Sequence, residues 1–329
     1  MNGTARAIGI DVGGTSVKGV LLGQDGSVLA VHRLPTPSPD PTGKGVADTV
    51  AQVRDALTTG ISDAGLPVGV AVPGVVDEES GLAVLSVNLG WRDVPMRDLL
   101  SERLGVPVAL SHDVRAGGVA EARTGAAAGA GGVVAFVPIG TGIAAAVLVG
   151  GRPIVAGGWA GEIGQLLITH GDFAGRRLEE VASARATALR AGVASAREVA
   201  SAAARGSAVS QQVWNETVTA LADALAALSA TVGPTVVVIG GGLALAGRQL
   251  MNPLDEELRR RLPGLRIPRL VAAAHGDAAA AVGAALLGLE QGQNLEQGQN
   301  LEQGQSLEQG RSRAGQSGSG QLSDLEQGA

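Results

Sequence analysis

Short apolar runs separated by glycine- and proline-rich turns predict a mixed α/β chain. Such runs, rich in β-branched residues, are typical of buried strands. Residues 7–10 and 17–22 form one pair of runs, joined by the glycine-rich turn from Asp11 to Ser16. The other predicted strands cover residues 68–72, 106–111, 133–138, 143–149 and 235–239.

Longer stretches with an apolar residue at every third or fourth position predict helices. The clearest covers residues 211–231, where an apolar stripe runs from Trp214 to Leu228 and Gly233-Pro234 ends the pattern. Asn252-Pro253 is typical of an N-cap followed by proline at the first helical position, which predicts a helix from there to about Leu262. Further helices are predicted over residues 44–59, 94–104 and 277–289, and from Val114 onward.

A strand–glycine turn–strand pattern occurs twice, at Asp11–Thr15 and again at Ile139–Gly142. The repetition indicates an α/β fold with two similarly built lobes. We expect residues 1–113 to form a smaller N-terminal lobe, completed by the C-terminal helix 277–289. Residues 114–276 would form the larger lobe.

The composition changes abruptly at Leu289. LEQGQN, LEQGQN and LEQGQS follow at six-residue intervals, before an end rich in serine, glycine and glutamine. Although hexapeptide repeats can form β-helices, four imperfect copies would bury little apolar surface. We therefore expect residues 290–329 to be a disordered low-complexity tail.

Composition and charge exclude several classes of function. The chain has no cysteine, so disulfides, cysteine zinc sites and cysteine nucleophiles are excluded. Of the net charge of −6, the tail carries most, and the nearly neutral body has no basic stretch that would bind nucleic acid. The sequence shows neither an apolar run of about 20 residues nor a signal peptide, so a soluble cytoplasmic protein is expected, without membrane contact.

The first glycine turn, Asp11-Val12-Gly13-Gly14-Thr15, is a candidate phosphate site. Glycines let backbone N–H groups converge on a phosphate, and Thr15 can add a hydroxyl donor. Asp11 can hold Mg²⁺, usually through water, beside a transferred phosphoryl group. An ordinary glycine hairpin explains the turn equally well when it is taken alone.

Two further glycine turns follow predicted strands, at Gly140-Thr141-Gly142 and at Gly240-Gly241-Gly242. Ligands of α/β proteins bind at the carboxyl ends of strands. Three such turns together favour a nucleotide bound in a cleft between two lobes. There is no GxxxxGK[ST] loop, and the four histidines lack the paired spacing of zinc enzymes.

Carboxylates near these turns are candidates for acid–base and hydroxyl-binding roles. Asp113 follows the predicted strand 106–111 and can act as a general base toward a hydroxyl, or as a helix N-cap. Glu162 lies between glycines and suits vicinal hydroxyls, although a solvated loop acid is the simpler interpretation. Glu179 or Glu180 is a second candidate hydroxyl ligand, and both also fit an exposed helix face.

In this order along the chain, the motifs resemble the ROK family of repressors, open reading frames and sugar kinases, which has the actin-like, hexokinase-like ATPase fold. The resemblance spans about residues 6–289. It is carried by Ile8–Gly19, Val72–Asp77, Asn88–Trp91, His112-Asp113, Ile139–Ile143, Ala160–Gly164 and Ile239–Gly242.

The resemblance implies an ATP- and Mg²⁺-dependent kinase that phosphorylates the 6-hydroxyl of an aldohexose, with glucose as the expected acceptor. Asp113 would be the catalytic base, and Asp11 would bind Mg²⁺ through water. The sugar site would comprise Gly74, Asn88, His112, Asp113, Glu162, Gln165 and Glu179. The nucleotide and phosphate site would comprise Asp11, Gly13, Gly14, Thr15, Lys18, Gly140, Thr141, Gly142, Gly240, Gly241 and Gly242.

Three departures from the family pattern concern the sugar site. His112 stands where the family usually has asparagine, and Gln165 replaces a histidine that binds both sugar and a structural zinc. The family's cysteine zinc motif is absent: HGDFAGRR, from His170 to Arg177, occupies its place. We therefore expect no structural zinc, and a loop held by packing instead, with Phe173 as the candidate contact.

Other functions stay open at the sequence level. A kinase for another hexose or an N-acetyl amino sugar, or one using polyphosphate, is the nearer alternative. A catalytically inactive sugar-sensing regulator is the alternative from another class. Only about six residues precede the first predicted strand, so no helix-turn-helix fits before it. The family resemblance further implies a homodimer or homotetramer.

Overall fold

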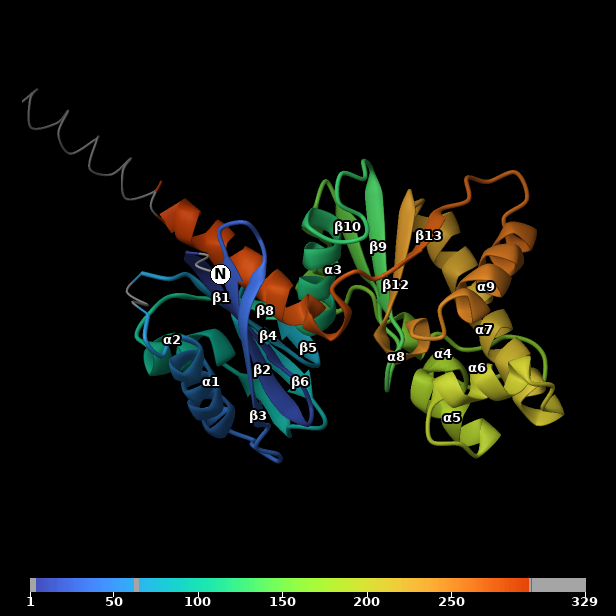
Figure 1. Cartoon of the computed structure of the whole chain (residues 1–329), viewed down its shortest axis with the longest axis horizontal. Coiled ribbons are helices and arrows are strands. Elements are labelled where there is room, and N and C mark those ends of the chain that lie inside the picture. Colours follow the sequence, from blue (N-terminus) through green and yellow to red (C-terminus); the bar gives the residue numbers. More distant parts are fainter. Residues whose placement is uncertain (1–3, 62–64, 296, 298–329) are drawn as a thin grey trace, which may run out of the picture.

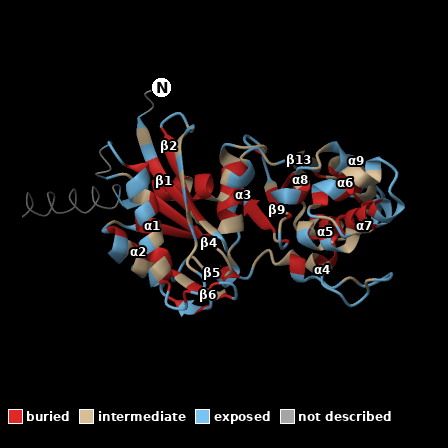
Figure 2. Ribbon diagram, turned by 60° about the horizontal axis from the view of Figure 1, so that its bottom comes forward, coloured by how far each residue is buried: buried red, intermediate tan, exposed pale blue. Residues whose placement is uncertain are grey.

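The computed structural model describes residues 4–61, 65–295 and 297, which form two large β-sheets flanked by helices (Figure 1). The first sheet has five strands in the order β3-β2-β1-β4-β8. Its central strands are buried, as the red ribbons of Figure 2 show. The strands are β1 (Ala5–Val12), β2 (Ser16–Gly23), β3 (Val28–Pro35), β4 (Val68–Val72) and β8 (Val108–His112).

The second sheet follows a related plan, in the order β11-β10-β9-β12-β13. Strand β1 pairs antiparallel with β2 and parallel with β4, and β9 likewise pairs antiparallel with β10 and parallel with β12. The α/β prediction with two related halves is therefore confirmed. The strands are β9 (Val133–Pro138), β10 (Ala146–Val149), β11 (Arg152–Pro153), β12 (Val236–Gly240) and β13 (Arg269–Ala272).

Helices cover both faces of the first sheet. On one face, α1 (Lys44–Leu57) and α2 (Met96–Leu104) bury their apolar stripes against β1 and β4. On the other face lie α3 (Asp113–Arg123) and the C-terminal helix, residues 279–295. This last helix approaches the sheet very closely, because a Cβ on Gly9 would lie 1.9 Å from the Ala281 carbonyl oxygen.

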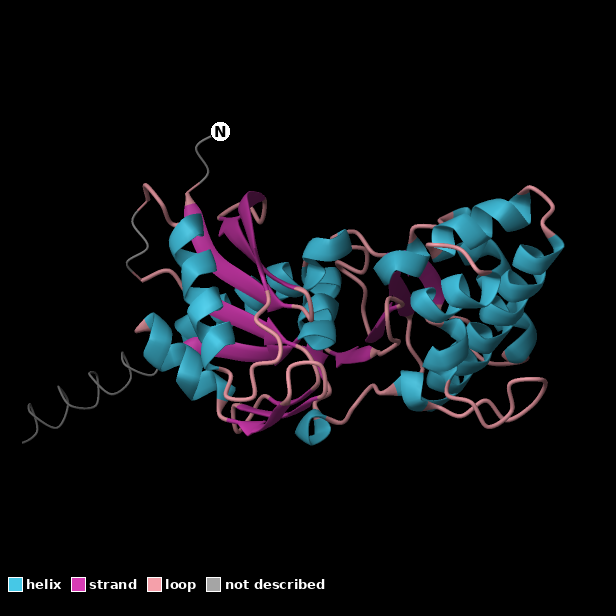
Figure 3. Ribbon diagram, turned by 90° about the horizontal axis from the view of Figure 1, so that it is seen from below, coloured by secondary structure: helices cyan, strands magenta, loops and turns pink. Residues whose placement is uncertain are grey.

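Most helices of the second half gather on one face of the second sheet (Figure 3). The other face packs against α3, which therefore lies between the two sheets. No helix of the described residues is both long and apolar enough to cross a membrane. The helices are α4 (Leu178–Ala182), α5 (Ala184–Ala191), α6 (Ala196–Ala204), α7 (Ala208–Val232), α8 (Gly241–Ala244) and α9 (Arg248–Arg261).

A third, antiparallel sheet lies between the predicted strand 68–72 and the predicted helix 94–104, a stretch for which no strand is predicted. Its strands are β5 (Val75–Asp77), β6 (Leu82–Ser86) and β7 (Trp91–Val94). Strands this short carry too few residues for an apolar alternation to stand out. Trp91 is buried and donates from Nε1 to the Asp40 carbonyl oxygen at 2.9 Å, so it belongs to the core beneath this sheet.

The predicted helix start at Asn252-Pro253 is wrong. Helix α9 begins at Arg248, and Pro253 lies inside it. A proline there has no N–H for the carbonyl oxygen four residues earlier. That oxygen, on Gln249, instead accepts a hydrogen bond of 3.1 Å from Trp214 Nε1 on α7, so a side chain replaces the missing backbone donor.

The chain end departs from the prediction as well. The last helix runs over residues 279–295 instead of 277–289, so residues 290–295 continue it rather than being disordered. Glu290 pairs with Arg123 on α3 at 2.7 Å, and Leu289 is buried, which favours continuation of the helix. The rest of the predicted tail, residue 296 and residues 298–329, lies outside the described residues.

Candidate active site

Three neighbouring parallel strands end at one edge of the first sheet. Register places Asp11 of β1 beside Ala71 of β4, which lies beside Ser111 of β8. The residues that follow these positions, Gly74 and Asp113 among them, therefore extend from the same edge. In open α/β sheets this edge is where ligands bind.

Asp11 has surroundings that disfavour its charge. Burial and, to a smaller extent, the nearby Asp113 carboxylate raise its pKa to about 7. Lys18, which is opposite Asp11 in the β1–β2 hairpin, lowers the pKa without compensating for these effects. The two aspartates are therefore close enough to interact, as a shared site requires.

Asp113 is the first residue of α3, and His112 occupies the N-cap position. The predicted N-cap role of Asp113 is therefore wrong: no side chain caps this helix, and Asp113 Oδ1 accepts only from the adjacent Val114 N–H, at 2.7 Å. The same oxygen lies 3.0 Å from His112 Nε2. Burial raises the pKa of Asp113 to about 6.

His112 is an uncharged neighbour of this carboxylate. Burial, together with the charge of Arg115, lowers the pKa of His112 to about 3. The imidazole is thus neutral near pH 7, and Nε2 is the ring nitrogen that lies next to Asp113 Oδ1. Within the described residues, the buried Nδ1 has no hydrogen-bond partner.

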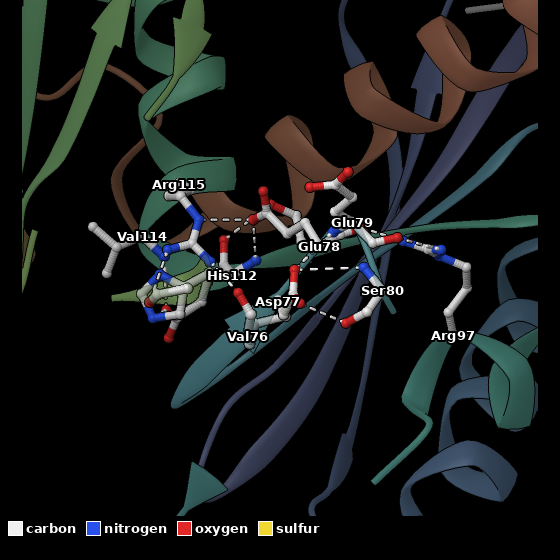
Figure 4. A network of polar contacts seen from close by, with 12 residues as sticks. Val76, Asp77, Glu78, Glu79, Ser80, Arg97, His112, Val114 and Arg115 are labelled. Carbon is white, nitrogen blue, oxygen red and sulfur yellow. Dashed lines mark hydrogen bonds and ion pairs between the residues drawn. The ribbon is translucent and has the colours of Figure 1, made fainter. Parts of the chain in front are cut away.

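A buried ion pair holds the junction between β8 and α3 (Figure 4). Glu78 Oε1 accepts three hydrogen bonds of 2.8 Å: from Ser111 Oγ, from the His112 backbone N–H and from Arg115 Nε. Sequence reasoning missed this pair because Glu78 and Arg115 are 37 residues apart. The only hint in the sequence is that Arg115 lies on the apolar side of a helix that begins with Asp113.

The loop that carries Glu162 lies close to Asp113. Burial raises the pKa of the half-buried Glu162; Arg115 lowers this pKa, whereas Asp113 and Glu179 raise it. The loop docks on the third sheet at Gly158, where a Cβ would lie 2.6 Å from the Val76 carbonyl oxygen. Glu162 is therefore not the solvated acid of the simpler interpretation.

Glu179 is the better placed of the two candidate glutamates. Its Oε1 accepts from Gln165 Nε2 at 2.9 Å, and its other carboxylate oxygen lies near Gly142. Glu180 is instead committed to Arg177, whose backbone N–H and guanidinium both bind its carboxylate. Arg177 also donates to Gln165 Oε1 at 3.1 Å, which fixes the orientation of the amide.

A cavity of about 700 Å³ brings candidate residues from both halves together. Asn88 comes from the third sheet, whereas Thr141, Gly142 and Glu179 come from the second half of the chain. Asn88 also lies near the first glycine turn, since a Cβ on Gly14 would be 3.9 Å from its side-chain nitrogen. The remaining lining residues are Arg176, Glu180, Ser183, Arg185, Ala186, Leu189 and Arg190.

The second and third glycine turns lie against each other. The Ile139 N–H donates to the Gly240 carbonyl oxygen at 2.9 Å, and the Leu243 N–H donates to the Ile139 carbonyl oxygen at 3.1 Å. Gly140, Thr141 and Gly142 are thereby adjacent to Gly240, Gly241 and Gly242. This arrangement agrees with one binding surface formed by both turns.

Some polar groups of the first turn, and the ammonium group of Lys18, already have partners within the chain. The Gly13 N–H already donates to the Ser16 carbonyl oxygen, and Thr36, which the motif analysis missed, binds the turn through its hydroxyl and its N–H. Gly14 and Thr15 are exposed and remain available to a ligand. Lys18 is buried, and its Nζ pairs with Asp277 at 3.4 Å.

The loop in the place of the cysteine motif forms a small hairpin. The Ile168 N–H donates to the Arg176 carbonyl oxygen, and the Gly175 N–H to that of Ile168. The Arg190 guanidinium lies 4.5 Å from the centre of the Phe173 ring, a cation–π contact. The predicted contact through Phe173 is therefore present, and it involves a charge as well as packing.

Comparison with known proteins assigns this arrangement to a family. The model described as "ROK family" matches residues 7–291. A glucokinase of Halalkalibacterium halodurans is 30% identical over 280 residues, covering 76% of this chain and 84% of that protein. An N-acetylmannosamine kinase of Escherichia coli is 31% identical over 302 residues, covering 88% of this chain and 99% of its own length.

Solved structures show the same fold. The ROK hexokinase from Thermus thermophilus matches with a TM-score of 0.72 at 30% identity, over 85% of this chain and 97% of that one. The inorganic polyphosphate/ATP-glucomannokinase from Arthrobacter matches with a TM-score of 0.66 at 32% identity, over 88% of this chain and all of its own. The expected hexokinase-like fold is thereby confirmed.

Proposed function

Because this chain belongs to the ROK family, we propose that it is an ATP-dependent sugar kinase that phosphorylates the 6-hydroxyl of an aldohexose, with glucose as the acceptor. The observation that carries the proposal is the position of Asp113. It lies at the carboxyl edge of the first sheet, near Asp11 on one side and Glu162 on the other. A hydroxyl bound there would be next to both a base and a phosphate site.

Asp113 would act as the general base. The Val114 N–H and His112 Nε2 both approach Oδ1, which leaves Oδ2 for the sugar. Oδ2 takes the proton of the 6-hydroxyl as that oxygen forms its bond to the γ-phosphorus of ATP. The bond from this phosphorus to the bridging oxygen breaks, and ADP leaves with the electron pair.

The sugar would be held by the groups around Asp113. Glu162, Glu179 and the Gln165 amide offer acceptors and donors for vicinal hydroxyls, and Asn88 lines the same cavity as Glu179. His112 and Gly74 border the same edge of the sheet. Lobe closure would bring these groups onto the sugar and exclude water, the competing acceptor.

ATP and Mg²⁺ suit the residues at the first turn. Two partly buried carboxylates with raised pKa values are stabilised by a divalent cation, and Asp11 offers the hard oxygen that Mg²⁺ prefers. When bound, Mg²⁺ neutralises phosphate charge. Gly14 and Thr15, with the turns at 140–142 and 240–242, would contact the nucleotide, and Lys18 would act beside them as a counter-charge.

The two lobes would divide at residue 113, with the C-terminal helix returning to the first lobe. The contact of that helix with the first sheet, at Ala7, Val20 and Leu22, supports this division. As an assembly we propose a homodimer or homotetramer, on family resemblance.

Two nearer alternatives rest on the relatives. The N-acetylmannosamine kinase supports an N-acetyl amino sugar as acceptor, and the glucomannokinase supports mannose as acceptor and polyphosphate as donor. A catalytically inactive sugar sensor is the alternative from another class. Asp113 and the first glycine turn, both retained, favour a kinase over a sensor.

The deciding experiment measures ADP release with ATP and Mg²⁺ over glucose, mannose, fructose, N-acetylglucosamine and N-acetylmannosamine. We expect turnover with glucose, and a fall in kcat of at least about 100-fold in Asp113→Asn. Asp98→Asn, an exposed change on α2, is the matched control and should stay within twofold. If no sugar supports turnover with ATP or polyphosphate, but glucose still quenches tryptophan fluorescence, the chain is a sugar sensor.

A further inference from the structure

The proposed reaction makes no use of Arg115, which is the most deeply buried charged side chain near the site. Only 1% of this side chain is exposed, against 15% for its partner Glu78. Burying such a pair costs desolvation energy on both sides and seldom adds net stability. Its presence beside Asp113 therefore calls for an explanation other than stability.

The donors of Arg115 reach three separate segments. Nε binds the Glu78 carboxylate at 2.8 Å, Nη2 binds the Val76 carbonyl oxygen at 2.7 Å, and Nη1 lies 3.4 Å from the Gly158 carbonyl oxygen. Arg115 itself is two residues beyond Asp113 on α3. One guanidinium thus connects the helix that carries the proposed base to the third sheet and to the loop that carries Glu162.

Glu78 completes the connection from the other direction. The oxygen that binds Arg115 also accepts from the backbone N–H of His112, the residue whose ring Nε2 lies 3.0 Å from Asp113 Oδ1. Ser111 Oγ binds the same oxygen, so the two positions before the base are held from the turn between β5 and β6. Both ends of the pair therefore act on the residues that place Asp113.

We propose that Arg115, with Glu78, is a positioning residue that sets the distance between the base Asp113 and the sugar-binding loop around Glu162. This inference rests on the proposed kinase function. Only a planar fork with several donors can bind a carboxylate and two backbone carbonyls at once, so lysine cannot replace arginine here.

The charge of Arg115 has a second effect on the same groups. It lowers the pKa of Asp113 and of Glu162, and it lowers that of His112. The other ionisable groups facing Asp113 are His112, on β8, Asp11, on β1, and Glu162. Loss of the guanidinium would therefore raise the pKa of the base as well as release it.

The test compares Arg115→Met, Arg115→Lys and Glu78→Gln with the full-length wild-type chain. We expect kcat to fall about 100-fold in Arg115→Met and about tenfold in the other two, with the KM for ATP within threefold of wild type. The acid limb of the pH profile should move to higher pH in Arg115→Met and stay in place in Arg115→Lys. The comparison of Arg115→Met with Arg115→Lys therefore distinguishes the effect of the positive charge from the effect of the hydrogen-bond geometry.

Arg97→Met is the matched control. Arg97, on α2, also donates to the turn between β5 and β6, at the carbonyl oxygens of Glu78 and Glu79, but its side chain contacts neither the Glu78 carboxylate nor α3 nor the sugar loop. It should keep kcat within twofold. A double variant, Arg115→Met with Glu78→Gln, should lose no more activity than Arg115→Met alone, because the two residues act as a unit.

Quenching of tryptophan fluorescence needs no catalytic turnover, so it tests the positioning role of Arg115 separately from the proposed kinase function. Trp159 follows Gly158 and is 59% exposed, whereas Trp91 and Trp214 are buried, so acrylamide quenching reports on this loop. We expect stronger quenching in Arg115→Met than in wild type or Arg97→Met. Wild-type values of kcat and quenching in a folded Arg115→Met or Glu78→Gln protein would overturn the inference. An inactive wild-type chain whose quenching still responds to Arg115 would overturn only the kinase.

Discussion

The raised pKa of Asp113 predicts how activity depends on pH. The base must be deprotonated to take the hydroxyl proton, and its pKa is raised to about 6. We predict that kcat/KM for the sugar is constant near pH 8 and falls at lower pH, with half its maximum near pH 6. An initial-rate series from pH 5 to 9 measures this, and an acid limb near pH 4 would contradict the burial argument.

The same shift predicts a stability gain on removing the charge. A folded-state pKa above the ordinary value of 3.8 means that the stability contributed by Asp113 is complete below pH 3.8 and is lost as the pH rises through 6. Asp113→Asn keeps the oxygen that accepts from Val114 and has no charge to bury. Its melting temperature without ligands should therefore exceed wild type by several degrees at pH 8 and match it near pH 4.

Asp25→Asn is a control for which the expected change in melting temperature is not an increase. Hydrogen bonds from Ser27 lower the pKa of this exposed carboxylate, so it stabilises the fold when charged. Its replacement should leave the melting temperature unchanged or slightly lower at pH 8. A rise in both variants would point to net charge instead of burial.

Individual residues differ in how far the sequence reveals them. Asp11, Asp113 and Glu162 stand beside glycines or at strand ends, and the structure brings them near one another. The choice of Glu179 over Glu180 agrees with the Gln165 contact. Arg115 and Glu78 belong to no local pattern, since their pairing depends on how β5 and α3 meet in space.

At the level of elements, helix α9 shows how a side chain can replace a backbone donor. Trp214→Phe keeps an aromatic ring against the helix but removes the Nε1 donor to Gln249, opposite Pro253. We predict a loss of about 1 kcal/mol and a melting temperature lower by about 2–4 °C. Trp159→Phe, at an exposed position, is the control and should change neither.

Helices and strands with a clear pattern of apolar residues were predictable from the sequence, whereas elements defined by tertiary contacts were not. The stripe from Trp214 to Leu228 correctly predicts α7, and the apolar runs correctly predict β4, β9 and β12. The three short strands of the third sheet were missed because only their mutual pairing defines them. The Asn252-Pro253 pattern is locally sound, and it fails because Trp214 supplies a hydrogen-bond donor from another helix.

At the scale of the whole molecule, the chain passes twice between the two large sheets. The first passage runs through α3, and the second follows β13. Glu121, which is completely buried, binds both: it accepts from the Ala126 N–H after α3 and from the Ala274 and His275 N–H groups after β13. One carboxylate thus fixes the two passages about which the lobes would move.

Glu121→Gln therefore tests the connection between the halves. An amide has one acceptor oxygen in place of two and brings N–H groups toward backbone donors. We predict a loss of about 2–3 kcal/mol and a melting temperature lower by about 5–10 °C. Glu102→Gln, exposed on α2, should be neutral. Equal melting temperatures for the two variants would show that Glu121 does not hold the passages.

The close packing of the C-terminal helix against the first sheet has a consequence for the order of folding during synthesis. Gly9 and Gly69 leave the first sheet open to this helix, whose backbone lies against them at Ala281 and Ala284. Until these residues leave the ribosome, α3 alone covers this face of the first sheet, and the part that the last helix covers stays exposed. The second sheet has all its strands and covering helices by residue 272, so the half of the molecule made later can finish folding first.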